Sequence, residues 1–145
     1  MPQVVVERAM RDASPGAVWP IVKNLLDYPK FMEQVISVAS LQSADGKSCT
    51  AWTVLFSGNE LQWTETDLYD EAARRIEFAQ IEGDLAEWNG TLEVLADGAG
   101  TLVRYTVNFD LGVPALAHVL HPLGGRAIRS NCEQMLAEIE LHVRS

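Results

Sequence analysis

The chain has 145 residues, the length of one domain, and carries 20 Asp and Glu against 11 Lys and Arg, a formal net charge of −9. This acidic balance argues against nucleic acids and anionic membrane surfaces as partners, because both attract basic patches. The hydrophobic content of 48% is that of a folded globular chain, and no apolar run approaches the roughly 20 residues that cross a bilayer, so no membrane insertion is expected. Two cysteines in no paired spacing and no signal-peptide pattern predict a cytoplasmic protein.

The first third of the sequence predicts one strand followed by two short helices. Residues 4–11 open on three valines, which favour a strand. Ser14-Pro15 then predicts a helix N-cap with proline at the first helical position. Pro20 falls inside the apolar spacing of that helix and predicts a kink or a short 3₁₀ stretch. Residues 27–32 predict a second short helical turn.

From Val35 onward the hydrophobic period changes to two, which predicts six consecutive antiparallel strands. They are expected at about 35–43, 48–56, 60–70, 74–82, 86–96 and 101–110. The period then becomes helical, with one apolar stripe made of Ile128, Cys132, Met135, Leu136, Ile139 and Val143. Pro122 and Gly124-Gly125 interrupt this region, so we expect a short helix near 115–121 and a long one from about 123 to 143.

This order of elements predicts an α+β fold in a single domain over residues 1–145. The long amphipathic helix has to bury its apolar stripe, and a curved antiparallel sheet of seven strands offers a concave face for it. One helix does not fill the full width of such a sheet. An internal pocket beside the helix is therefore expected.

Strand alternation predicts which side chains face this interior. In the strand that begins near Glu60, Trp63, Glu65 and Asp67 share one face, and the apolar start of that face indicates that it points inward. The same rule assigns a set of aromatic residues to the interior: Trp52, Trp63, Phe78, Trp88, Tyr105 and Phe109. Aromatic walls with few polar groups suit a flat apolar ligand, although the same rings can also simply fill a core.

Glu65 is the most informative polar residue of the predicted interior. A buried carboxyl group without a cationic partner tends to stay protonated, and it can then donate a hydrogen bond or move a proton. Two alternatives stay open. Glu65 and Asp67 can lie at a solvated strand end, or Glu65 can form a structural ion pair with Arg8, Arg104 or Arg126.

The last helical region supplies further candidates. His118 and His121 lie three residues apart, which can suit a metal, but no Cys, Asp or Glu lies close in sequence to complete a site, and no metal is expected. Asn131 and Met135 are candidate ligand contacts, whereas Cys132 is expected to be a packed thiol. No nucleotide, flavin or metal motif occurs, and no cofactor is expected.

Three segments resemble a known superfamily. They are Ala13-Ser14-Pro15-Gly16-Ala17-Val18-Trp19, Tyr28-Pro29-Lys30-Phe31 and Phe109-Asp110-Leu111-Gly112-Val113-Pro114. With the order of elements, they resemble the START-like (SRPBCC, helix-grip) superfamily, and within it the polyketide cyclase/dehydrase and coenzyme Q-binding-like group. The resemblance covers nearly the whole chain. It implies the helix-grip fold and an internal cavity for a hydrophobic small molecule, and it is weak for function because the superfamily holds carriers, enzymes and sensors.

The resemblance leaves two main functions open. As a polyketide aromatase/cyclase, the protein would use Glu65 as acid and base and Tyr105 and His121 as orienting groups, and an acyl-carrier protein would be its partner. Its ligand contacts would be Trp52, Trp63, Phe78, Trp88, Phe109, His118, Asn131 and Met135. Well-studied aromatase/cyclases carry an arginine where this chain has Asp67, which places that chemistry in doubt.

As a non-catalytic carrier of a lipid or quinone-like ligand, the protein would need only the cavity and a gate. A third hypothesis is an interaction module like the ribosome-associated toxin branch, which the net charge of −9 disfavours. The exposed edges of the sheet also suggest a homodimer.

Overall fold

The structure is a computed structural model that describes residues 3–41, 48–56, 58–110 and 114–145, with side chains in the last helix described from residue 125 onward. Seven strands form one antiparallel sheet in the spatial order β1-β7-β6-β5-β4-β3-β2. They are β1 (Gln3–Met10), β2 (Val35–Leu41), β3 (Ser48–Phe56), β4 (Asn59–Asp70), β5 (Arg75–Gly83), β6 (Glu87–Asp97) and β7 (Gly100–Asp110). The helical elements are α1 (Pro15–Lys23), the 3₁₀ turn η1 (Leu25–Asp27), α2 (Tyr28–Phe31) and α3 (Pro114–Arg144).

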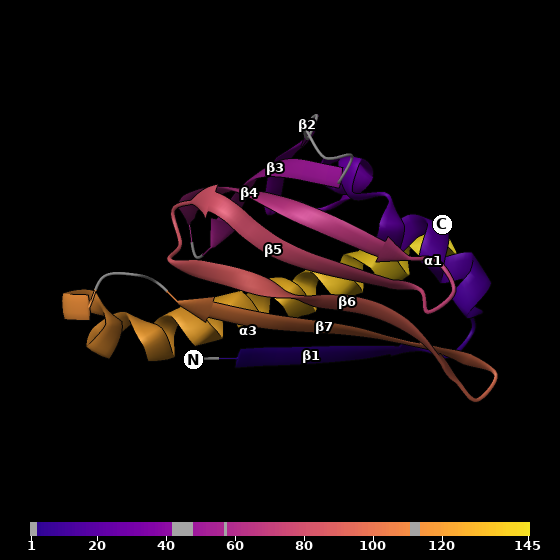
Figure 1. The fold of residues 1–145 in the computed structure, drawn as a ribbon. Helices are drawn as coiled ribbons and strands as arrows, with labels where there is room; N and C mark the ends of the chain where they lie inside the picture. The colour runs from indigo at the N-terminus through magenta and orange to yellow at the C-terminus, as the bar shows by residue number, and fades with distance from the viewer. Residues whose placement is uncertain (1–2, 42–47, 57, 111–113) are drawn as a thin grey trace.

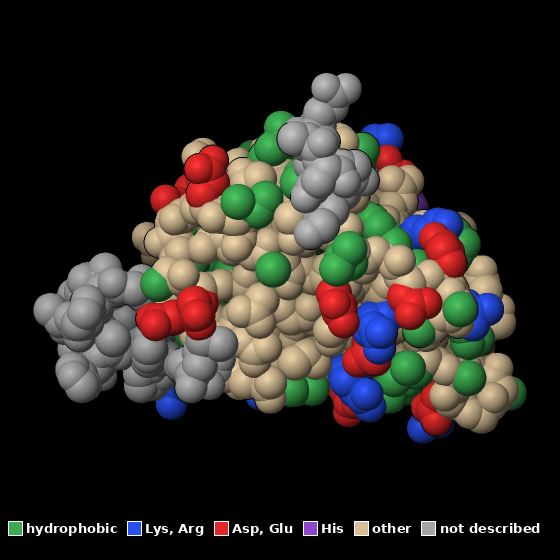
Figure 2. All heavy atoms as spheres, viewed as in Figure 1, with side chains coloured by type: hydrophobic (Ala, Val, Ile, Leu, Met, Phe, Trp, Pro, Cys, Tyr) green, Lys and Arg blue, Asp and Glu red, His purple; other side chains and the backbone are tan. Residues whose placement is uncertain are grey.

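The sheet curves over α3, as Figure 1 shows, and α1 lies near the C-terminal end of that helix. The outer face of the sheet, seen in Figure 2, carries mostly neutral side chains and backbone, with charged side chains toward its ends. The predicted α+β class, the antiparallel sheet of seven strands and the long C-terminal helix are confirmed. None of the helices in the described ranges combines the length and apolar character needed to cross a bilayer.

The helix break predicted at Pro122 is wrong. The last helical region is one helix, α3, which continues through Pro122 instead of breaking there. The helix α1 also continues through Pro20, so the 3₁₀ turn does not lie there but later, at Leu25–Asp27. A kink at Pro20 stays a prediction. An internal proline removes one backbone donor, a cost that burial of the rest of a helix can offset. The predicted end of β2 at residue 43 lies outside the described residues.

The core lies between the concave face of the sheet and α3. From α3 it receives the predicted apolar stripe, whose buried members are Ile128, Cys132, Met135, Leu136 and Ile139. At the other end of the fold, the Ser14 hydroxyl accepts a hydrogen bond from the Ala17 N–H at 3.2 Å and caps α1 as predicted. The Tyr28 hydroxyl donates to the Val22 carbonyl and fixes α2 against α1. These contacts hold the helices at the edge of the core.

Gly90 permits a close approach between β6 and β7. A Cβ atom at this position would lie 1.9 Å from the carbonyl oxygen of Thr106 and 3.0 Å from the Phe78 ring. Such distances are far below van der Waals contact, so a larger residue would force the two paired strands apart. The glycine is required here by space and not by a positive φ angle.

We predict that Gly90→Ala lowers the free energy of unfolding by about 1–3 kcal/mol, the range for overpacking a core. Gly16→Ala is the matched control, because the nearest atom to its added Cβ would lie 4.0 Å away and α1 favours alanine by about 0.5–1 kcal/mol. Urea unfolding followed by circular dichroism measures both variants. Equal stability of the two variants would contradict the tight β6–β7 approach.

Candidate functional site

An aromatic chamber lies between the sheet and α3. Its sheet side comes from alternating residues of β3, β4, β6 and β7, and its helix side comes from α3. The lining residues are Trp52, Val54, Phe56, Trp63, Trp88 and Tyr105, with Asn131, Cys132 and Met135 from α3. All of them are buried, which agrees with the inward faces that strand alternation predicted.

The rings nearly fill this chamber. Trp52 and Trp63 are stacked, with ring centroids 5.9 Å apart and planes 4° from parallel, and Trp88 lies 5.0 Å from Trp63. Phe56 meets Trp88 edge to face, with centroids 5.9 Å apart. The free volume left among the rings is about 10 Å³, about the room for one water molecule. A ligand can therefore enter only if the rings or α3 move.

Two carboxyl groups are buried beside the chamber. Glu65 and Asp67 follow Trp63 on the inner face of β4 and are 4% and 2% exposed. The Trp63 indole N–H donates to Glu65 Oε1 at 2.7 Å. The Thr50 hydroxyl donates to Asp67 Oδ2 at 2.6 Å, and the Trp52 indole N–H donates to that hydroxyl at 2.7 Å. Both stacked tryptophans are thus tied to the carboxyl pair through their nitrogen atoms.

The carboxyl pair shares a proton. Glu65 and Asp67 lie close enough to shift each other's pKa, and a hydrogen bond between them needs a proton on one of the two because a carboxylate has no donor. Burial raises the pKa of Glu65 well above its usual value, and the neighbouring Asp67 raises it further. Burial also raises the pKa of Asp67, while its hydrogen bonds with Glu65 and Thr50 lower it. We therefore place the shared proton on Glu65.

An orphan oxygen agrees with this assignment. Asp67 Oδ1 is buried and meets no N–H or hydroxyl donor in the described part of the chain. A protonated Glu65 supplies the missing donor. With the proton on Glu65, Asp67 is the group of the pair left to ionise, and the Thr50 hydroxyl donates to it.

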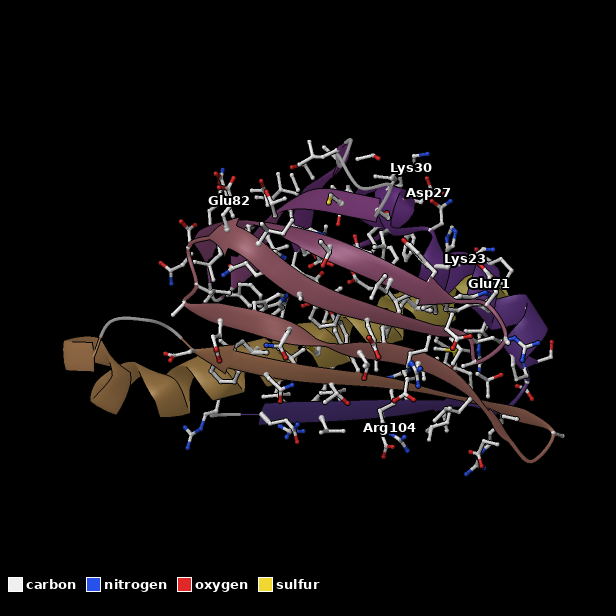
Figure 3. All side chains as sticks on the ribbon, viewed as in Figure 1. Lys23, Asp27, Lys30, Glu71, Glu82 and Arg104 are labelled. Carbon is white, nitrogen blue, oxygen red and sulfur yellow. The ribbon has the colours of Figure 1, made fainter. Side chains whose placement is uncertain are left out.

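Neither alternative for Glu65 agrees with the structure. Both carboxyl groups are buried, so they do not lie at a solvated strand end. Arg8 forms its ion pair with Glu140 at 2.6 Å, and Arg104 pairs with Glu7 at 2.7 Å. Figure 3 shows Arg104 beside β1 at the margin of the sheet. Arg126 is exposed, and none of the ion pairs among the described side chains includes Glu65 or Asp67.

The phenols and the thiol described near the chamber stay neutral at physiological pH. Burial raises the pKa of Tyr28 and of Tyr105 well above the usual value for a phenol, and raises that of Tyr69 to about 12. Burial likewise raises the pKa of the Cys132 thiol to about 12, which agrees with its predicted role as a packed thiol. Tyr105 therefore keeps its hydroxyl proton and can act as a hydrogen-bond donor.

The structure brings together most of the candidate site residues. Trp52, Trp63, Trp88, Tyr105, Asn131 and Met135 line the chamber, while Phe78 and Phe109 are buried in the surrounding core. His118 and His121 fall in the part of α3 whose side chains lie outside the described set, so their roles stay predictions.

Thr50 is the functional residue that sequence reasoning missed. It is 4% exposed, pairs with Glu65 across β3 and β4, and links Trp52 to Asp67. Its position two residues before an inward-facing tryptophan was the available signal. Alternation places Thr50 inside, but only the strand register shows which carboxyl it meets.

A curved antiparallel sheet that wraps a C-terminal helix and encloses an aromatic chamber defines the START-like, helix-grip class of proteins. Residues 12–136 match the family described as polyketide cyclase/dehydrase and lipid transport, and the chain belongs to this family. The resemblance seen in the sequence is confirmed. No curated protein matches the sequence.

Solved structures share the fold across nearly the whole chain. TTHA0849 from Thermus thermophilus is 27% identical with a TM-score of 0.89, and the match covers 98% of this chain and 97% of that one. A START superfamily protein from Mycobacterium smegmatis is 18% identical with a TM-score of 0.82, over 98% and 97%. The Zhui aromatase/cyclase from Streptomyces sp. R1128 is 17% identical with a TM-score of 0.78, over 99% and 93%.

We predict that Glu65→Gln makes the protein less sensitive to alkaline pH. Because the pKa of Glu65 is raised on folding, this group favours folding most below its ordinary pKa of about 4.3, and that contribution falls as pH rises. Glutamine keeps an acceptor for Trp63 and gives Asp67 a permanent N–H donor. The stability of Glu65→Gln relative to wild type should therefore increase from pH 5 to pH 9.

Urea unfolding at several pH values measures this effect, with a slope difference of at most about 1.4 kcal/mol per pH unit for one proton. Glu77→Gln, an exposed residue of β5, is the matched control and should run parallel to wild type. Parallel curves for Glu65→Gln as well would contradict a proton held by Glu65.

Proposed function

We propose that the protein binds a hydrophobic small molecule with an aromatic or polyketide-type skeleton in the chamber, and that Glu65 transfers a proton during its cyclisation. The observation that carries this proposal is the pairing of tryptophan walls with a buried carboxyl pair that has no cation among the described residues. The family and its fold support a ligand of this general kind. An acyl-carrier protein and a homodimer stay predictions for the partners.

The walls favour a flat ligand. Aromatic rings stack on planar molecules with little loss of side-chain entropy, and the stacked Trp52 and Trp63 pair already shows the preferred spacing. In the ligand-free protein the rings pack on one another, so a ligand exchanges ring–ring contacts for ring–ligand contacts. The Tyr105 hydroxyl is the donor on the chamber wall suited to hold a ligand carbonyl.

The proposed chemistry is intramolecular aldol closure followed by loss of water. A base removes a proton from a carbon between or beside carbonyl groups, and that carbon forms a bond to a second carbonyl carbon, whose oxygen takes up a proton. Elimination of water then gives the aromatic ring. In the ring closure the Asp67 carboxylate takes the carbon proton and the protonated Glu65 donates to the carbonyl oxygen, so the pair again carries one proton. In the dehydration the two groups exchange roles: Asp67 protonates the leaving hydroxyl and Glu65 takes the carbon proton. Confinement of a flexible chain supplies the ring-closing geometry.

A carrier without catalytic activity is the second candidate. The two carboxyl groups are not among the residues that line the chamber, and both accept hydrogen bonds from protein groups. A carrier needs the apolar chamber alone. The two functions predict different effects of Glu65→Gln. An enzyme would lose turnover in this variant, whereas a carrier would bind its ligand as before.

Ligand binding is tested with menadione, a flat quinone that quenches tryptophan fluorescence. We expect Trp88→Leu to weaken its binding by about two- to tenfold, because a stacking wall worth about 0.5–1.5 kcal/mol is lost. Trp19→Leu is the matched control, since Trp19 is equally buried but lies on α1 and bonds to Glu71, outside the chamber. If menadione binds to Trp88→Ala but not to the wild type, the aromatic cluster is a packed core, because the smaller side chain creates a cavity that the wild type lacks.

Catalysis is tested with heptane-2,4,6-trione, which closes to 5-methylresorcinol with loss of one water. We expect the wild type to accelerate formation of the ring, measured by chromatography, and Glu65→Gln to reduce that rate by about 10²–10⁴-fold while menadione still binds. A wild type that binds menadione but leaves the triketone at its rate in buffer would favour the carrier.

A further inference from the structure

A polar hollow opens on the surface next to the chamber. We call it the vestibule, and its volume is about 350 Å³. It lies between the start of β2, the β3–β4 turn and α3. Its lining includes Glu33, Gln34, Gly58, Ser130, Asn131 and Gln134. Amide and hydroxyl groups thus replace the aromatic rings of the chamber.

The vestibule and the chamber share Asn131. This residue is 7% exposed and lines both spaces. The neighbouring Gln34 is also 7% exposed, and its Nε2 donates to the Asn131 carbonyl at 3.2 Å. A molecule that fills the chamber and extends toward the surface at this point has to pass Asn131 and reach Gln34.

Gln34 offers an unused acceptor at this junction. Its Nε2 donates to the Asn131 carbonyl and the side chain also hydrogen-bonds the Glu138 carboxyl group, so its Oε1 is the acceptor end of the amide. Oε1 is buried and has no donor among the described residues. A buried acceptor without a donor costs free energy, which a ligand N–H or O–H would recover.

The charges around the vestibule disfavour an anion. Its lining contains the carboxylate of Glu33 and no Lys, Arg or His among the described residues. Glu138 lies beside it, because its Oε2 accepts a hydrogen bond from the Glu33 N–H at 3.2 Å. A carboxylate or phosphate would meet like charge there and gain no cation from the described lining.

We propose that the vestibule binds the polar end of the ligand, and that this end is a neutral chain bearing amide N–H or hydroxyl groups. The proposal rests on the proposed function, because the apolar end of the same ligand occupies the chamber. The ligand is then amphipathic: a flat hydrophobic body followed by an uncharged, hydrogen-bonding tail. Gln34 and Asn131 select the tail, and the tryptophans select the body.

Three probes with one ring system test the tail. They are 2-naphthylacetyl-glycinamide, with a neutral amide tail, 2-naphthylacetyl-glycine, with a carboxylate, and 2-methylnaphthalene, with no tail. Displacement of menadione measures their affinities. We expect the glycinamide to bind on the order of tenfold more tightly than the other two, as one or two added hydrogen bonds predict.

Variants of lining residues test whether the preference for the glycinamide probe arises in the vestibule. Gln34→Leu should reduce it severalfold or more, and Gln134→Leu at the exposed rim provides a second variant with little risk to folding. Gln62→Leu, an exposed amide of β4 outside the vestibule, is the matched control and should keep the preference. Urea unfolding verifies that each variant is folded.

The outcomes separate this proposal from the proposed function. The vestibule proposal is overturned if menadione binds but the three probes have equal affinities, or if neither vestibule variant changes the order of their affinities. In both cases the proposal that the chamber binds a ligand is unaffected. If menadione and 2-methylnaphthalene both fail to bind, the proposed function itself is overturned, and the vestibule proposal with it.

Discussion

The hydrogen-bonded pair of Glu65 and Asp67 is the constraint on which the interior depends. Two carboxyl groups are buried in an apolar core, and no described cation pairs with them, so only a shared proton and donated hydrogen bonds can hold them there. The donors are the Trp63 indole and, through Thr50, the Trp52 indole. The pair therefore fixes the nitrogen edges of two rings and, with them, the walls of the chamber.

This coupling has a consequence for how the chamber opens. With room for about one water molecule, it admits a ligand only when a ring or α3 moves. Displacement of Trp63 would break its bond to Glu65 and remove a donor from a buried carboxyl group. Movement of α3 leaves both indole bonds in place. On energetic grounds, the helix is the element expected to yield first.

Much of the fold and many of the site residues follow from sequence periodicity. The alternation through Trp63, Glu65 and Asp67 predicts their burial, because a period of two admits only two faces and the apolar one lies inside. The continuity of α3 through Pro122 did not follow, because tertiary packing overrides a local breaker. The link through Thr50 depends on strand register, and the room left in the chamber depends on how rings from four strands pack. Neither the Thr50 link nor the free volume of the chamber can be predicted from any single segment of the sequence.

The same stretch of α3 forms both the chamber and the vestibule. Ser130 and Gln134, four residues apart, lie on the vestibule side, whereas Met135 lies on the chamber side. Successive residues of a helix point about 100° apart, so neighbours such as Gln134 and Met135 face different spaces. Asn131 lies at the boundary and lines both the vestibule and the chamber. A small rotation of α3 would therefore exchange polar for apolar lining at the junction. The helix that is expected to move first when the chamber opens therefore also sets which part of a ligand meets polar groups.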